Sequence, residues 1–190
     1  NDNVNIGYRA GYSNTTNGER TCVGDSAALY NTGTANTAVG KDALEGTSGS
    51  STGGYNVAVG NYALTKLTTG IRNTSVGYTA GDLLTEGLHN TFVGYQAGDI
   101  VTTGDNNTCI GSNADASSAT VNNEITLGDS NVTALRCQVT SITSLSDKRD
   151  KTNIEDSNYG LDVIEKLKPV TFDWDMRDSG KVGIKDLGFI

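Results

Sequence analysis

The stretch Asn73-Thr74-Ser75-Val76-Gly77-Tyr78-Thr79-Ala80 recurs 17 residues later as Asn90-Thr91-Phe92-Val93-Gly94-Tyr95-Gln96-Ala97. An apolar residue followed by Gly repeats in the same way up to residue 128, with spacings of 17, 16, 20, 17, 17, 17 and 17. A fixed period in this range is typical of units that stack and contact only their neighbours. The first two thirds of the chain are therefore predicted to form a rod. The apolar-Gly pairs are Ile6-Gly7, Val23-Gly24, Val39-Gly40, Val59-Gly60, Val76-Gly77, Val93-Gly94, Ile110-Gly111 and Leu127-Gly128.

Other positions also repeat when the Gly of each pair is the reference. Asn recurs four residues before it, Thr three before it, Ala three after it and a second Gly seven before it. Each unit is expected to contain a turn, a short strand, a corner of small residues and a second short strand, such as the one at 99–103. No unit has a helical period of ten residues or more, whereas Thr, Val, Asn and Gly favour strands and turns. The pattern predicts a mainly β fold, a parallel β-solenoid or β-roll of 17-residue repeats.

Successive strand residues point to opposite faces, so the Thr and Val positions share one face and the residue between them occupies the other. Neither face is charged, which predicts that both are covered. Burial of one Val or Ile stabilises a coil by about 1.5–3 kcal/mol, against about 25 kcal/mol for ordering its residues. Packing the second face against identical chains would supply the difference, so we expect a homotrimer. The residues of the second face are Asn5, Cys22, Ala38, Ala58, Ser75, Phe92, Cys109 and Thr126.

The composition excludes several classes of function. The 190-residue chain has a net charge of −8 and no basic stripe, which argues against nucleic-acid binding. It has no long apolar run, signal peptide or lipidation motif, so no membrane insertion is expected. The chain opens inside a repeat, and we expect it to be a fragment of a longer protein.

The cysteines and the histidine indicate no metal site and no cofactor. Cys22 and Cys109 lie in the small-residue column, where an inert free thiol is the usual occupant, and Cys137 lies outside the repeats. An odd number of cysteines without a CxxC motif argues against both a disulfide framework and zinc. His89 is the single histidine and falls in a turn, so one chain cannot build a histidine-based catalytic set.

The repeat ends after Gly128, and the architecture changes. Residues 132–143 alternate like a strand, and a run of charged residues follows at 146–151. Apolar residues at 161, 164 and 167 have helical spacing, and residues 170–174 read as a strand after Pro169. We therefore expect three parts: a β-roll rod at 1–131, a β transition segment at 132–145, and the N-terminal part of a small α+β domain at 146–190.

Four stretches of the last part carry a resemblance. Residues 146–154, 160–170, 172–174 and 188–190 resemble the start of the intramolecular chaperone domain of phage tail spikes and fibres, the peptidase S74 family. Residues 1–128 also resemble, more weakly, the left-handed β-roll of trimeric adhesin heads. The S74 resemblance implies a truncated domain that trimerises, helps the upstream β-structure to assemble and then cuts itself off. It places the nucleophile at Ser146, the base at Lys151 and the cut between Ser146 and Asp147.

The chemistry of such a dyad allows three routes of attack. A serine hydroxyl becomes a nucleophile when a lysine with a lowered pKa accepts its proton. Attack of Ser146 on its own carbonyl would need a strained four-membered ring. An N→O shift at Leu145–Ser146 passes through a five-membered ring, and attack on a neighbouring chain avoids the ring. The alternative for 146–151 is a solvated linker.

The expected function is structural and adhesive: a segment of a trimeric viral tail fibre or spike for host attachment, exposed on the virion and synthesised in the host cytoplasm. Its partners would be two further copies, other tail proteins and a host-surface glycan or protein receptor. One alternative is a polysaccharide-degrading spike that uses Asp82 and Asp99, one coil apart at about 5 Å, a separation found in retaining glycosidases. The other is a cell-surface trimeric adhesin without autocleavage. Tyr8, Tyr78 and Tyr95 form either an aromatic strip for sugars or, as we expect, half-buried wall residues.

Overall fold

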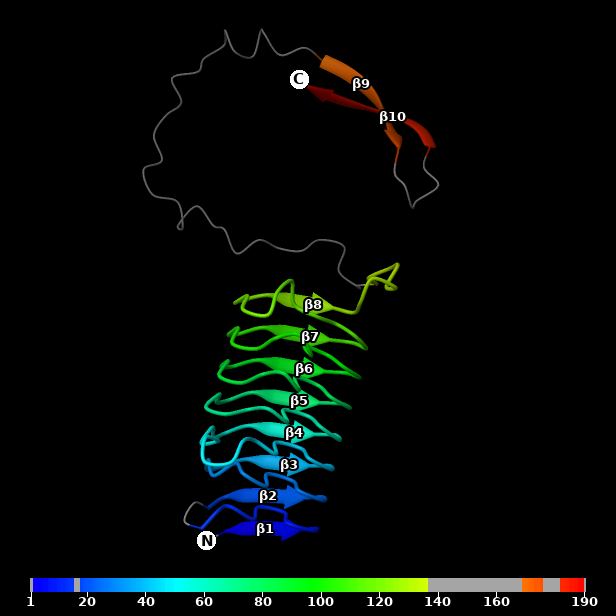
Figure 1. Cartoon of the computed structure of the whole chain (residues 1–190). Coiled ribbons are helices and arrows are strands. Elements are labelled where there is room, and N and C mark those ends of the chain that lie inside the picture. The colour runs from blue at the N-terminus through cyan, green and yellow to red at the C-terminus, as the bar shows by residue number, and fades with distance from the viewer. Residues whose placement is uncertain (1, 16–17, 137–168, 176–181, 190) are drawn as a thin grey trace, which may run out of the picture. The chain divides into compact units, whose positions relative to one another are not determined.

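A computed structural model describes residues 2–15, 18–136, 169–175 and 182–189 of the chain. The chain divides into two compact units, Asn1–Arg136 and Cys137–Ile190. In the first unit, each coil contributes one short strand to a parallel sheet of eight strands in sequence order, as Figure 1 shows. The predicted parallel β-solenoid is confirmed. The strands are β1 (Asn3–Ile6), β2 (Arg20–Val23), β3 (Thr37–Val39), β4 (Val57–Val59), β5 (Thr74–Val76), β6 (Thr91–Val93), β7 (Thr108–Ile110) and β8 (Ile125–Leu127).

Equivalent residues of neighbouring coils lie side by side in the sheet. Val59 pairs with Val76, and Val76 pairs with Val93, so the sequence repeat is also the strand register. The coil with three extra residues keeps this register, because Val39 still pairs with Val59. The extra residues form an exposed loop whose end is fixed by Ser51, which is buried and donates its hydroxyl to the Leu67 carbonyl at 2.9 Å.

The Gly that follows each strand is required for both its dihedral angle and the space around it. At Gly40, φ is 134°, and a Cβ atom there would lie 2.6 Å from the carbonyl carbon of Gly60 in the next coil. A side chain would therefore both strain the backbone and force the coils apart. The same overlap with the next coil occurs from Gly7 to Gly94 along this column, which explains the period of the sequence.

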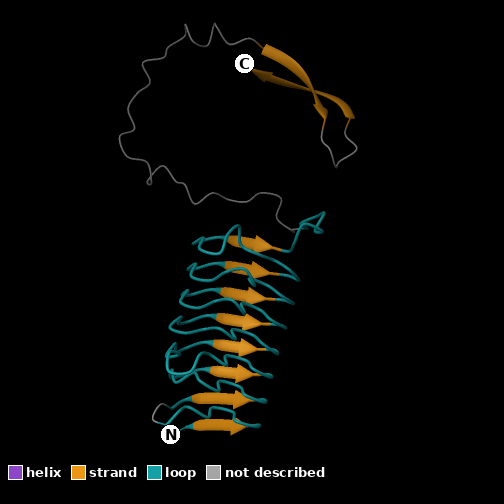
Figure 2. Ribbon diagram, viewed as in Figure 1, coloured by secondary structure: helices purple, strands orange, loops and turns teal. Residues whose placement is uncertain are grey.

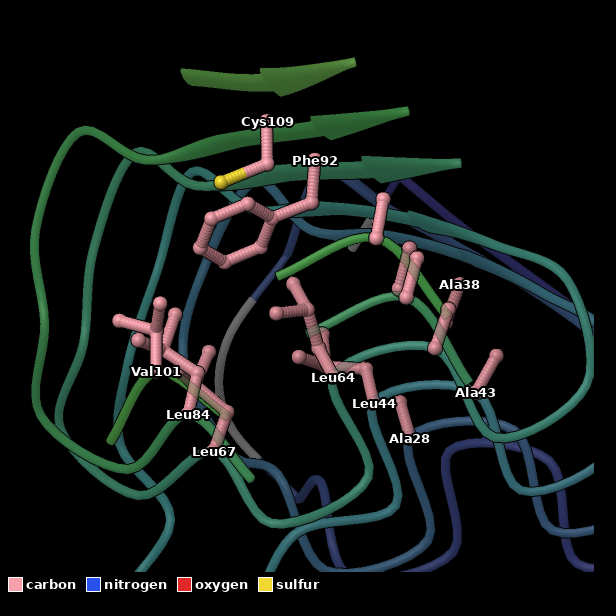
Figure 3. Packing of buried hydrophobic residues seen from close by; sticks show 14 of the residues in the cluster. Ala28, Ala38, Ala43, Leu44, Leu64, Leu67, Leu84, Phe92, Val101 and Cys109 are labelled. Carbon is pink, nitrogen blue, oxygen red and sulfur yellow. The ribbon is translucent and has the colours of Figure 1, made fainter. Parts of the chain in front are cut away.

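The interior of the solenoid is filled by the small-residue column and by the residues across from it (Figure 3). Cys22, Ala38, Ala58, Phe92 and Cys109 are buried, and so are the Ala residues after each turn. The opposite wall is formed by leucine and valine side chains. The small-residue column was expected to pack against identical chains, and this is wrong: it faces the interior of the single chain, and the Val positions point outward. The wall residues are Leu67, Leu84 and Val101.

A ladder of buried asparagines connects the coils inside the solenoid. The Asn73 backbone N–H donates to Oδ1 of Asn56 at 2.9 Å, and its Nδ2 donates to the Gly87 carbonyl at 2.8 Å. Asn90 repeats both bonds one coil later, to Asn73 and to Gly104. These bonds satisfy polar groups that would be costly to bury unpaired. Each of these asparagines connects its own coil to the coil before it and to the coil after it.

The second strand expected in each unit is absent from the described coils, as the loops of Figure 2 show. At 98–101 the chain turns instead: Gly98 has a φ of 66°, and the Val101 N–H donates to the Gly98 carbonyl at 3.2 Å. The coils remain bonded here without extended backbone, because the Thr85 N–H donates to the Thr102 carbonyl at 2.8 Å. This wall is therefore a stack of turns.

In the second unit, β9 (Pro169–Asp175) and β10 (Val182–Phe189) form an antiparallel pair, with Phe172 opposite Asp186. The strand predicted at 170–174 is confirmed. The helix expected around 161–167 lies outside the described residues. Of the strand-like segment expected at 132–143, the described part at 132–136 is not a strand.

Candidate functional site

The three residues predicted for self-cleavage, Ser146, Asp147 and Lys151, lie outside the residues that the structure describes, and so does Cys137. The candidate sites with defined geometry are therefore on the solenoid. Three of them matter: the outward face of the sheet, a tyrosine column beside it and a row of aspartates on another wall.

We call the solvent-facing side of β1–β8 the outward face. It is formed by the first and third residues of each Thr-x-Val triplet. Its two columns are Val4, Thr21, Thr37, Val57, Thr74, Thr91, Thr108 and Ile125, and Ile6, Val23, Val39, Val59, Val76, Val93, Ile110 and Leu127. None of these side chains is charged, and all but Leu127 are β-branched. Val76 is 37% exposed and Ile110 43% exposed. Parallel sheets usually have both faces covered, so this open apolar face is unusual.

Tyrosines follow the sheet in the columns after the Gly residues. Tyr78 and Tyr95 are 46% and 51% exposed, which agrees with the expectation of half-buried wall residues, whereas Tyr8 is more exposed at 67%. Their rings stack with centroids 5.6 Å apart and planes at 10°, and Tyr62 meets Tyr78 edge-on at 5.9 Å. Tyr8 stands apart, with the Arg9 guanidinium 5.2 Å from its ring. Because two of the rings cover one another, they leave edges rather than a continuous flat strip for a sugar.

Asp82, Asp99 and Asp115 form a row on the wall beyond the Ala corner. Burial raises the pKa of Asp82, and the neighbouring Asp99 raises it further, whereas Lys66 opposes the shift. Burial and Asp99 also raise the pKa of Asp115, whose Oδ1 is buried without a hydrogen-bond partner. The expected proximity of Asp82 and Asp99 is therefore visible in their electrostatics.

Of these carboxylates, Asp115 alone lines the open pocket at the last coil of the solenoid. This pocket has a volume of about 550 Å³, and Thr126 and Asp129 line it together with Asp115. Among the described residues, no three His, Cys, Asp or Glu side chains are grouped in a way that could hold a metal ion.

Arg20 is a feature that the sequence pattern alone did not single out. It occupies the ladder position that Asn holds in later coils, and its side chain is 1% exposed with no hydrogen-bond partner for any guanidinium nitrogen. Burial lowers the pKa of Arg20 and raises that of the adjacent Cys22. The signal was present in the sequence as a basic residue in a column that otherwise holds Asn, with Glu124 at its other end.

The two described cysteines are free and buried, as expected. Burial, together with Asp115 and Glu124, raises the pKa of Cys109 to about 11. Such a thiol is protonated at neutral pH and is a poor nucleophile. These cysteines therefore contribute packing rather than chemistry.

No helix in the described residues has the length and apolarity that a membrane span requires. Neither the comparison with curated proteins nor the comparison with solved structures found a match. The family model described as Chaperone of endosialidase (Peptidase_S74) matches residues 146–190. The end of the chain is thus similar to a chaperone of endosialidase, and a parallel β-solenoid precedes it.

Proposed function

We propose that this chain is a segment of a trimeric fibre or spike, in which the solenoid is the shaft and residues 146–190 begin the chaperone that guides its assembly. The observation that carries the proposal is the order of the two parts: the chaperone-of-endosialidase match follows a repetitive β-structure directly. Each parallel strand pairs with a strand about 17 residues away, so the chain must close a loop before any strand pair forms, and this slows folding. An assembly chaperone next to such a shaft would therefore help a slowly folding structure to form.

The shaft suits a presenting role better than an enzymatic one. Its coils are held by in-register strands, stacked turns and the asparagine ladder, so it is a regular and stiff support. Its surface carries exposed tyrosines and a loop at 47–50, features that can contact a host-surface glycan or protein. We place the shaft on the outside of a virion, with other tail proteins as its neighbours.

We further propose that Ser146 and Lys151 carry out self-cleavage. The Lys151 amine accepts the proton of the Ser146 hydroxyl, Oγ attacks a backbone carbonyl, and the C–N bond breaks as the departing amine takes up the proton. Water then hydrolyses the ester to a free carboxylate. If the attack is between chains, the cut falls after Ser146; if it is an N→O shift, it falls before Ser146.

The test is the mass of the products from full-length protein. Wild-type protein should yield a shaft fragment that ends at Leu145 or Ser146, and the two routes differ by the mass of one Ser residue. Ser146→Ala and Lys151→Ala should give intact chains, whereas the neighbouring control Ser144→Ala should be processed normally. Cleavage in either dyad variant would refute the dyad.

A further inference from the structure

We infer that the outward face of β1–β8 is the surface through which three copies of this chain pack, parallel and in register, around a common axis. The inference rests on the proposed trimer and specifies which side of the solenoid forms it. Figure 1 shows the sheet on one side of the stacked coils, with all eight strands aligned.

The first argument is the chemistry of this face. Its columns combine apolar and Thr side chains without a charge. In the inner coils, Val76 is 37% exposed, Val93 36% and Ile110 43%, whereas the apolar residues of β2–β4 are partly buried. A contiguous apolar patch of this kind marks an interaction surface. The face lies over a parallel sheet, which normally requires cover on both sides.

The second argument is the distribution of charge around the face. Charged residues stand two positions before and two positions after the Thr-x-Val triplets, such as Glu19 and Arg72 on one side and Asp25 and Lys41 on the other, where tyrosines share the column. All four side chains are exposed. An apolar centre with a polar rim is the usual anatomy of a protein interface. Each chain has a net charge of −8, so copies can meet closely where neither carries charge.

The third argument is the period, which selects the partner. The face offers the same two side chains at every step of about 4.8 Å, over eight strands and therefore roughly 34 Å. A globular partner would match one or two of these steps. A second copy, parallel and in register, presents the same period and can match all of them.

The test uses the full chain with Cys137→Ser, so that no cysteine outside the described residues can react. Val76→Cys and, separately, Val93→Cys place a thiol on the face, where identical residues of different copies approach the common axis. The control Thr69→Cys lies on the same coil as Val76 and is exposed, but it belongs to the stacked-turn wall. Under mild oxidation, the two face variants should form disulfide-linked dimers, and the control should remain as single chains.

A second set of variants measures assembly without cross-linking. Val76→Asp with Val93→Asp should reduce the native mass from three chains to one and leave the β-type circular dichroism unchanged. The matched pair Thr69→Asp with Thr103→Asp, also exposed, should stay trimeric. A wild-type trimer that neither cross-links at Val76 and Val93 nor dissociates with aspartate there would overturn this inference and leave the trimer intact. A wild-type chain that is a monomer or a dimer would instead overturn the trimer itself.

Discussion

Phe92 occupies the space that a side chain at Gly81 would need: a Cβ atom on Gly81 would lie 2.6 Å from Cδ2 of the Phe92 ring. Gly98, one coil further on, is in closer conflict with the same ring. In other coils the sizes are reversed, with Ala58 on the strand and Leu64 at the corner, both fully buried. The same interior space is therefore filled from the strand in one coil and from the corner in another.

This pairing predicts a compensating double substitution. Phe92→Ala should lower the free energy of unfolding by about 3–5 kcal/mol, because it leaves a cavity. Gly98→Leu should also destabilise, because its side chain would overlap the ring. The double variant recreates the Ala58–Leu64 pair, and Leu64 shows that this backbone accepts leucine with a φ of 51°. Denaturant unfolding should therefore show the double variant to be more stable than either single one.

The exposed Tyr95→Ala is the control for loss of an aromatic ring on the same coil, and it should cost less than about 1 kcal/mol. Additive losses in the double variant would mean that Phe92 and Gly98 do not share one space.

The asparagine ladder predicts a large difference between two chemically identical substitutions. Asn73→Ala removes the acceptor of the Asn90 N–H and the donor to the Gly87 carbonyl, both buried. Leaving such groups unpaired should cost about 2–4 kcal/mol. Asn61→Ala removes one exposed bond, from the Lys41 N–H, and should cost less than about 1 kcal/mol. Equal losses of unfolding free energy in urea would show that the buried ladder stabilises the fold no more than an exposed hydrogen bond does.

The aspartate row predicts a loss of stability as the pH rises. The pKa of Asp115 is raised in the fold, so its ionisation costs stability as the pH rises above the ordinary value of 3.8. Asp115→Asn should therefore raise Tm at pH 7, by about 1–3 °C, and this gain should disappear below pH 3.8. Asp129 is the opposite case, because hydrogen bonds from Asn131 lower its pKa. Asp129→Asn should not raise Tm at pH 7, and a similar gain for both variants would contradict the assignment.

Cys109 predicts a loss of stability in alkali. Its pKa is about 11 in the fold and 9.0 ordinarily, so the unfolded chain ionises first and folding is disfavoured as the pH rises between these values. The loss should amount to at most about 3 kcal/mol by pH 11. Cys109→Ala should lack this loss in urea titrations at pH 8 and pH 11. Rapid alkylation of native Cys109 at pH 8 would contradict the raised pKa.

The stacking of the coils could be predicted from the sequence because one backbone requirement repeats. Gly40 and its equivalents need a positive φ and no Cβ atom, so a Gly residue recurs in the sequence once per coil. The burial of Cys22 and Cys109 followed from strand alternation and residue size. These features depend on neighbours one coil away, which the repeat brings into register.

Other features could not be predicted in this way. The segment at 99–103 has strand-like residues, but the turn at Gly98 gives it a different backbone. Which strand face turns inward depends on the direction in which each corner bends, so Val76 could not be placed outside from alternation alone. The mutual stacking of Tyr78 and Tyr95 likewise depends on the offset between coils. The candidate dyad at Ser146 and Lys151 stays a prediction.

The central claim is that this chain assembles as three parallel copies through the outward face of its sheet. The most direct measurement is the native mass of the full chain beside the Val76→Asp, Val93→Asp double variant. With both proteins kept uncleaved by Ser146→Ala, we predict three times the chain mass of 19.8 kDa without the aspartates and a single chain mass with them, and the same circular dichroism for both. A single chain mass for both, or three times that mass for both, would contradict the account.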